Sequence, residues 1–182
     1  MLIVLSGVSG SGKNTVIEEI LKERKDFKVF RSAITRPPRE NEDQKGFYIF
    51  ISEQEFLKKV EEGAFFEYEF LHNSYRGILK AELEKAKMDE KHHYIRDIDV
   101  KGNQKLRKFF HNKGVLSIFL EVDDKELQRR LKARGESDQQ IKLRLSRAPM
   151  ERTYKKDYDL IIQNNDLALT VEKILEFVDK HS

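Results

Sequence analysis

The sequence predicts an α/β protein with a central parallel β-sheet, because apolar runs of strand length alternate with amphipathic stretches along most of the chain. An apolar run at 2–6 enters a glycine-rich turn and then a helical pattern over 15–24. Further strand-length runs at 115–122 and 159–165 are each followed by a helical pattern. Strands that alternate with helices are joined by crossover connections, and these connections make neighbouring strands parallel.

Composition limits the kinds of partner that the chain can have. Its 182 residues suit one domain with a substantial core. The 35 basic and 32 acidic residues leave a net charge of +3, so we expect no nucleic-acid partner. The absence of cysteine excludes disulfides and thiolate metal sites. We find neither a signal-peptide pattern nor an apolar run of the ~18 residues that span a membrane. We therefore expect a cytoplasmic monomer or homodimer with no membrane partner.

The glycine-rich turn predicts a phosphate site. Residues 7–13 have the spacing Gly-x-x-x-x-Gly-Lys of a P-loop, whose backbone N–H groups and following helix bind phosphate. Lys13 would reach the β and γ phosphates of a nucleoside triphosphate. Asn14 stands where a hydroxyl normally ligates Mg²⁺, and its amide oxygen could still ligate the cation. The competing interpretation is a chance glycine-rich turn. The expected triphosphate contacts are Gly7, Ser9, Gly10, Ser11, Gly12, Lys13, Asn14 and Thr15.

Residues 32–87 interrupt the alternation of strands and helices, so we expect an insert with its own small mixed α/β structure. It opens with an extended loop at 31–40, whose paired prolines fix where Arg36 and Arg39 point. Two arginine forks on a stiff loop suit a phosphate group, and solvated surface charges are the competing interpretation. The elements that we expect inside the insert are strands at 46–51 and 64–70, helices at 52–62 and 79–88, and a turn at 73–77.

The alternation resumes after the insert. Asp97 and Asp99 follow a new apolar strand and would lie at its carboxyl end, where parallel sheets bind ligands. Helix capping is the alternative role for Asp99. Two arginine-rich helices interrupted at Gly135 suit a lid that closes over phosphates, or a surface pair with ordinary salt bridges. The elements that we expect here are a strand at 93–99, helices at 103–111, 125–133 and 167–178, and a second long lid helix.

Together these parts resemble the guanylate kinase family over nearly the whole chain. The resemblance is carried by the P-loop and, in chain order, by Thr35-Arg36-Pro37-Pro38-Arg39, Gly46 to Phe50, Phe66-Glu67, Asp97-Ile98-Asp99 with Gly102, Arg134-Gly135-Glu136-Ser137, and Tyr158-Asp159 with Asn164. It implies a P-loop core at 1–31 and 88–182, a monophosphate-binding insert at 32–87 and a helical lid at about 125–156 within the core. It also implies transfer of the γ-phosphoryl group of ATP, with Mg²⁺, to GMP or dGMP.

The resemblance also implies roles for single residues. The implied contacts of the monophosphate are Ser32, Arg36, Arg39 and Tyr48, with Glu67 and Asp97 reading guanine. A carboxylate suits guanine because it can accept hydrogen bonds from the N1–H and N2–H₂ groups together. The implied catalytic cations are Lys13, Arg36, Arg39, Arg130, Arg134 and Arg144. Asn164 is placed near the adenine of ATP, and Asp99 near the magnesium ion, through water.

The sequence departs from the family pattern beside the base. Arg76 stands where a tyrosine is expected, Tyr75 lies one place earlier, and Ile78 replaces a hydroxyl that helps to read guanine. We count all three among the substrate contacts. Two other functions stay open at this stage. One is a kinase for another nucleoside monophosphate or a phosphorylated ribose, which Arg76 and Ile78 favour; the other is a catalytically weak protein-binding module, which Asn14 favours.

Overall fold

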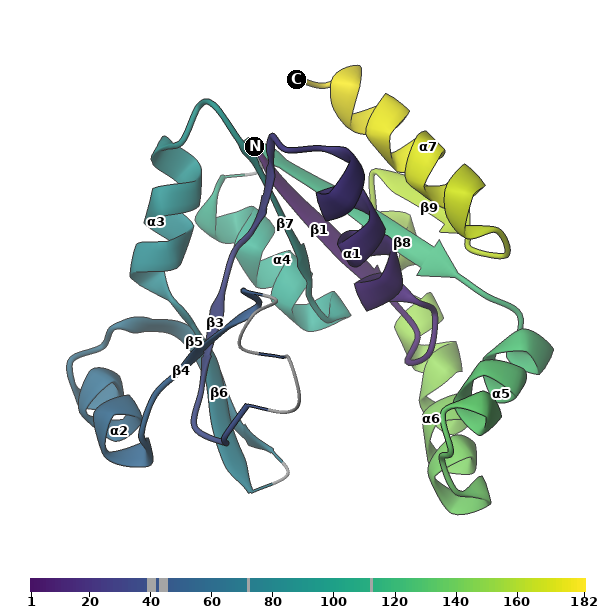
Figure 1. Ribbon diagram of the computed structural model, residues 1–182, viewed down its shortest axis with the longest axis horizontal. Coiled ribbons are helices and arrows are strands. Elements are labelled where there is room, and N and C mark those ends of the chain that lie inside the picture. The colour runs from purple at the N-terminus through teal and green to yellow at the C-terminus, as the bar shows by residue number, and fades with distance from the viewer. Residues whose placement is uncertain (39–41, 43–45, 72, 112) are drawn as a thin grey trace. The chain divides into compact units, whose positions relative to one another are not determined.

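The computed structural model describes residues 1–38, 42, 46–71, 73–111 and 113–182 (Figure 1). Arg39, which the sequence assigns to the monophosphate, lies outside these residues. The chain divides into two compact units. The core unit comprises Met1–Phe27 and Ile95–Ser182, and the insert unit comprises Lys28–Tyr94. Among the described residues, no helix has both the length and the apolar character needed to cross a membrane.

A five-stranded sheet has the strand order β2-β7-β1-β8-β9 (Figure 1). Its strands are β1 Leu2–Gly7, β2 Phe27–Val29, β7 His93–Asp97, β8 Val115–Glu121 and β9 Leu160–Gln163. Strand β8 pairs in parallel with β1 on one side and with β9 on the other, which confirms the parallel sheet. The first four residues of β1 are buried apolar side chains, because a parallel strand is covered on both faces.

The helices of the core unit bury apolar faces against this sheet and against one another. They are α1 Lys13–Glu23, α4 Val100–Phe109, α5 Asp124–Ala133, α6 Asp138–Arg152 and α7 Leu167–Asp179, with a short 3₁₀ turn η1 at Lys155–Asp157. Helix α1 buries Val16, Ile17 and Ile20 and lies beside β1 and α7. Helices α5 and α6 form the expected hairpin and lie side by side in Figure 1. The predicted order of strands and helices in this unit is confirmed.

The insert unit holds a four-stranded sheet of order β4-β3-β6-β5. Its elements are β3 Ser32–Ile34, β4 Tyr48–Phe50, α2 Glu53–Glu61, β5 Phe65–Leu71, β6 Ser74–Leu79 and α3 Lys80–Met88. Two predictions were wrong here. Residues 32–34 form a strand within the expected loop, and residues 74–79 form a strand where we expected a turn over 73–77. We expected a turn over 73–77 because glycine is common in turns, and Gly77 lies in this stretch.

Close approach of two strands explains Gly77. A Cβ atom at this position would lie 2.7 Å from Cδ1 of Phe65 and 2.8 Å from the carbonyl oxygen of Glu67 on β5. A glycine inside a strand often marks such a close approach, and here it lets β6 continue past β5.

Helix α2 was predicted correctly: the Ser52 hydroxyl accepts from the Glu55 N–H at 3.1 Å. Helix α2 buries Phe56, while Leu57 is 40% exposed.

The close approach leads to a test of stability. We expect Gly77→Ala to lower the free energy of unfolding by about 2 kcal/mol, because the added methyl group overlaps backbone and ring atoms that cannot move independently. Urea denaturation would measure the loss. Gly63→Ala is the comparison, since its φ is +63° and its Cβ would meet no atom within 4 Å. That variant should lose about 1 kcal/mol from backbone strain alone. Equal losses in the two variants would contradict the close-approach argument.

Candidate functional site

The P-loop connects β1 to α1, as predicted. Gly7, Gly10 and Gly12 have φ values of +147°, +93° and +92°. Residues that carry a Cβ atom rarely adopt these backbone conformations. Gly12 is the N-cap of α1 and supplies no side-chain cap, and the first turn of α1 contains no acidic residue. The first N–H groups of a helix lack intrahelical partners, and the helix dipole favours an anion beside them. This end of α1 therefore suits a phosphate group.

The Lys13 ammonium group is held over the P-loop. Its Nζ donates to the carbonyl oxygens of Gly7 at 2.8 Å and Val8 at 3.3 Å. Burial lowers the pKa of Lys13, while the carboxylates of Asp97 and Glu151 act in the opposite direction. These two carboxylates favour the charged form of the lysine that phosphate binding needs.

Asn164 ties the P-loop to the end of β9. Its side chain is buried, its Nδ2 donates to the Ser11 carbonyl oxygen at 2.6 Å, and its Oδ1 accepts from the Thr170 hydroxyl at 2.9 Å. Arg130 adds two bonds, from Nη1 to the Ser11 carbonyl at 3.3 Å and from Nη2 to the Asn164 carbonyl at 2.8 Å. The position of Asn164 near adenine stays a prediction; the structure shows that its side-chain amide is buried and that its hydrogen bonds hold the loop.

A pocket of about 380 Å³ lies beside the P-loop within the core unit. It is lined by Gly10, Gly12, Thr15, Arg129, Arg130, Ala133, Arg134, Asn164, Asn165 and Leu167. The Arg134 side chain is exposed there, at the C-terminal end of α5. The pocket thus brings together the loop glycines, Thr15 and two of the predicted lid arginines. Its size and its arginine lining suit part of a nucleotide.

The second lid helix also reaches the P-loop. The Arg144 guanidinium group donates to the Ser9 hydroxyl and forms an ion pair with Glu136. One turn further along α6, Ala148 is buried in a cluster with Val8 of the loop. Arg147, which follows Arg144 by three residues, is exposed. Lid residues and P-loop residues are therefore in direct contact within one unit.

The two aspartates after β7 have different surroundings. Asp99 is the N-cap of α4, and its Oδ1 accepts from the Gly102 N–H at 2.6 Å. The capping role that the sequence left open is thus the one that the structure shows. Asp97 lies 3.3 Å from Nε of the buried Arg96 and is close enough to Lys13 to raise the pKa of that lysine.

In the insert unit, strand register brings four predicted substrate contacts into one row. Glu67 on β5 pairs with Ile78 on β6, Ile78 pairs with Ser32 on β3, and Ser32 pairs with Tyr48 on β4. Residues directly opposite each other on paired strands project from the same face. The row therefore places a carboxylate, an apolar side chain, a hydroxyl and a phenol on one face of this sheet. Arg76 lies on the same face, two residues from Ile78.

A β-bulge decides the position of Glu67. The pairing passes from Phe65 opposite Leu79 directly to Glu67 opposite Ile78, so β5 carries one extra residue. A bulge of this kind reverses the faces that follow it. Phe65 stacks on Phe56 of α2 with ring centroids 4.2 Å apart, in the aromatic core of the unit. In a regular strand, Glu67 would lie on the same face as Phe65, because it follows Phe65 by two residues.

Tyr75, which the sequence predicts as a substrate contact, lies on the other face of the insert sheet. Because β6 is a strand, Tyr75 and Arg76 project from opposite faces. Tyr75 packs on the core face, with its ring centroid 5.3 Å from that of Phe56.

Arg36 has an acidic partner within the insert unit. Its Nη1 and Nη2 donate to the two carboxylate oxygens of Glu42 at 2.6 Å and 2.7 Å, and its guanidinium carbon lies 5.7 Å from the centre of the Tyr48 ring. A carboxylate and a phosphate are bound by the same planar fork. The arrangement shows that Arg36 and Tyr48 are close enough to act on one anion.

Comparison with known proteins identifies the family. The sequence model of the guanylate kinase family matches residues 1–181. This chain belongs to the guanylate kinase family. The guanylate kinase of Porphyromonas gingivalis is 38% identical over 176 residues, which cover 95% of this chain and 93% of that protein. The guanylate kinase of Chlorobaculum tepidum is 36% identical over 174 residues, with 95% and 89% covered.

Solved structures agree. The crystal structure of guanylate kinase from Anaplasma phagocytophilum matches with a TM-score of 0.74 and 26% identity, over 100% of this chain and 85% of that one. A second match, an uncharacterized protein from Eubacterium ventriosum, has a TM-score of 0.54 and 12% identity and supports the fold alone.

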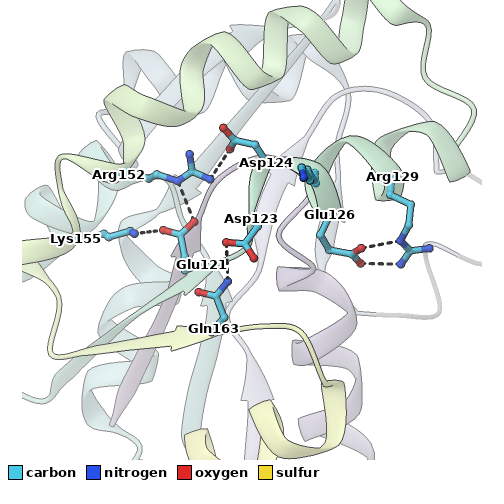
Figure 2. Close-up of a pocket in the computed structure, with 9 residues that line it drawn as sticks. Glu121, Asp123, Asp124, Glu126, Arg129, Arg152, Lys155 and Gln163 are labelled. Carbon is cyan, nitrogen blue, oxygen red and sulfur yellow. Dashed lines mark hydrogen bonds and ion pairs between the residues drawn. The ribbon is translucent and has the colours of Figure 1, made fainter.

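A larger hollow in this guanylate kinase family member does not have the features of a phosphate site. It lies at the carboxyl end of β8 and has a volume of about 850 Å³. Figure 2 shows the residues that line it. Arg152 is paired there with Glu121 at 2.9 Å and with Asp124 at 2.7 Å, and Arg129 is paired with Glu126 at 2.7 Å. These arginine forks are already neutralised by the carboxylates that surround them, which disfavours an anionic ligand.

Sequence reasoning missed three residues of the site: Glu42, Glu151 and Thr170. Glu42 is bound to Arg36, Glu151 interacts with Lys13, and Thr170 supports Asn164. The sequence spacing could have indicated Glu151, because this residue follows Arg144 by seven positions and therefore lies on the same face of α6. The other two depend on contacts that spacing does not reveal.

Thr170 offers a test of the support beneath the P-loop. The single hydrogen of its hydroxyl is shared between Asn164 Oδ1 at 2.9 Å and the Asp166 carbonyl oxygen at 2.6 Å. Thr170→Val keeps the shape but leaves a buried amide oxygen unpaired, so the free energy of unfolding should fall by about 1–2 kcal/mol. Thr153→Val is the matched control, since that hydroxyl is exposed and bonds only within the last turn of α6. The account is contradicted if chemical denaturation finds the same stability for the two variants.

Proposed function

We propose that this chain transfers the γ-phosphoryl group of ATP to GMP, or to dGMP, giving GDP or dGDP and ADP. The observation that carries the proposal is the row on the insert sheet, in which the bulge puts Glu67 on the same face as Ser32 and Tyr48. The Glu67 carboxylate can accept from both donors on the guanine edge. Adenine would present an acceptor there, and an unpaired carboxylate in a dry pocket is costly.

The reaction needs no covalent enzyme intermediate. A phosphate oxygen of GMP attacks the γ-phosphorus of ATP in line, the bond to the β-phosphate oxygen breaks, and catalysis consists of positioning and charge neutralisation. Lys13 leaves the carbonyl oxygens of Gly7 and Val8 to bind the triphosphate. Arg36, together with Arg39 from the same sequence motif, holds the phosphate of GMP. Arg134 and Arg144 bring positive charge from the lid.

The residues of the P-loop fit a magnesium ion that arrives with ATP. Asn14 is exposed in the first turn of α1, and the part of the chain that the structure describes has no group of three acidic, histidine or cysteine side chains able to hold a metal. Mg²⁺ typically takes most of its ligands from phosphates and water. Asn14 would be its direct protein ligand, with Asp99 acting through water. When bound, the ion neutralises charge on the phosphate oxygens.

A substrate panel tests the function. We expect MgATP-dependent turnover of GMP and dGMP with kcat/KM at least about 100-fold above that of AMP, CMP, UMP and ribose bisphosphate, measured as ADP release. Lys13→Ala should lower turnover by about 10³-fold or more while the circular dichroism spectrum is retained. Equal use of all bases, or a preference for the ribose bisphosphate, would point to a different kinase. Calorimetry without ATP or GMP binding would point to a protein-binding module.

Asn14 offers a separate test of metal binding. Asn14→Ser restores the shorter hydroxyl ligand, so the Mg²⁺ concentration for half-maximal turnover should fall several-fold. Asn14→Ala removes the ligand, so the same concentration should rise. The measurement is turnover against free Mg²⁺ at a fixed ATP concentration. If the two variants behave alike, the side chain at this position does not ligate the ion.

A further inference from the structure

The two ends of the lid hairpin, α5 and α6, are joined by one arginine. The chain enters the hairpin after Glu121, the last residue of β8, and leaves it at Arg152, the last residue of α6. Arg152 Nε donates to Glu121 Oε1 at 2.9 Å, and its Nη2 donates to the Val122 carbonyl oxygen at 2.9 Å. The same Nη2 lies 2.7 Å from Oδ1 of Asp124, the first residue of α5 (Figure 2). One guanidinium group therefore holds the exit of the lid to its entrance.

A second cation, from the segment that follows the lid, strengthens this junction. Lys155 of η1 forms an ion pair with Glu121 Oε2, and its Nζ lies 5.8 Å from the centre of the Phe119 ring on β8. Glu121 is buried, with 8% of its surface exposed. Removing one partner of a buried ion pair is strongly destabilising, because it leaves a charge without full compensation. The junction therefore disfavours any arrangement in which Arg152 leaves Glu121.

The last turn of α6 depends on these contacts more than the end of a regular helix would. Pro149 lies inside α6, and proline has no N–H to donate to the carbonyl oxygen four residues earlier. The last turn is therefore joined to the rest of α6 by one hydrogen bond fewer. Tertiary contacts have to hold it in place, and Arg152 supplies two hydrogen bonds and two ion pairs for this purpose.

The same helix presents Arg144 to the P-loop. Arg144 contacts the Ser9 hydroxyl, and Ala148 packs in an apolar cluster with Val8. The eight residues from Arg144 to Arg152 span about 12 Å of helix. Apolar packing is non-directional, so the contact of Ala148 does not by itself fix the rotation of α6 or its shift along its axis. Hydrogen bonds have preferred distances and angles, and those of Arg152 restrict both.

We propose that Arg152 is a positioning residue of the lid: it holds the last turn of α6 against the end of β8 and so fixes where Arg144 meets the P-loop. The inference rests on the proposed function, because the position of Arg144 affects turnover only if the lid supplies positive charge to the transferred phosphoryl group. Arg152 acts through α6, and its own guanidinium group is already paired with carboxylates. Its loss should therefore lower kcat without weakening the binding of GMP to the insert unit.

Two substitutions remove the junction in steps. Arg152→Met removes the charge and every hydrogen bond, whereas Arg152→Lys keeps the charge but replaces the planar fork by one amino group. Arg24→Met is the matched control. Arg24 also joins two elements, because it caps the end of α1 away from the P-loop and its Nη1 lies 3.1 Å from Asp179 at the end of α7. The side chains of Arg152 and Arg24 are 24% and 29% exposed, so the two losses are comparable.

Initial rates would give kcat and the KM values for ATP and GMP, and hydrogen exchange on the full chain would give the protection of the α6 amides. We expect Arg152→Met to lower kcat about 10-fold or more, because a misplacement of about 1 Å can cost 100-fold in rate, while KM for GMP changes less than about twofold. The α6 amides should exchange faster in this variant. Arg152→Lys should lie between it and the wild type, and Arg24→Met should keep the wild-type kcat and α6 exchange despite a lower Tm.

Two results would overturn the inference. The first is a wild-type kcat in folded Arg152→Met. The second is an equal fall of kcat in Arg24→Met, which indicates a general loss of stability. If Arg152→Met does not fold, Arg152→Lys carries the test by the same selective fall of kcat. If the wild-type chain does not phosphorylate GMP, the proposed function fails, and hydrogen exchange decides on the junction alone: faster α6 exchange in the Arg152 variant supports it, and unchanged exchange overturns it.

Discussion

The carbonyl oxygen of Ser11 is the point on which the site depends. It accepts from the buried Asn164 amide at 2.6 Å and from Arg130 at 3.3 Å. Gly12, the next residue, has a φ of +92°, and a Cβ there would lie 2.8 Å from the Asn164 amide nitrogen. The P-loop therefore has its shape before any ligand binds, and a ligand does not have to supply the free energy of ordering it.

A second constraint acts in the insert unit. One extra residue in β5 separates the aromatic core, where Phe65 stacks on Phe56, from the face that carries Glu67. Gly77, which pairs with Tyr68 just after the bulge, allows the strands to approach there. The base recognition that we propose for Glu67 thus depends on a backbone irregularity as much as on the carboxylate. The same irregularity places the apolar side chain of Ile78 beside Glu67.

Local patterns were sufficient for the P-loop and for the order of elements in the core unit. The glycine spacing, the strand before it and the helix after it are all encoded within 24 residues. The strand at residues 74–79 was not predicted, because the sequence around Gly77 gives no local sign that a second strand pairs with it. Asn164 is 153 positions from the carbonyl that it binds, so the sequence could place it near the nucleotide but could not reveal that its amide is already occupied.

The central claim is that ATP binds a P-loop already held by Asn164 and Arg130. A crystal structure with a non-hydrolysable ATP analogue tests it most directly. The account predicts that Lys13 Nζ moves from the Gly7 and Val8 carbonyl oxygens to the phosphates, while Asn164 Nδ2 stays within hydrogen-bonding distance of the Ser11 carbonyl. The claim would be contradicted by a triphosphate bound with that hydrogen bond broken, or by a triphosphate bound in the hollow at the carboxyl end of β8 (Figure 2).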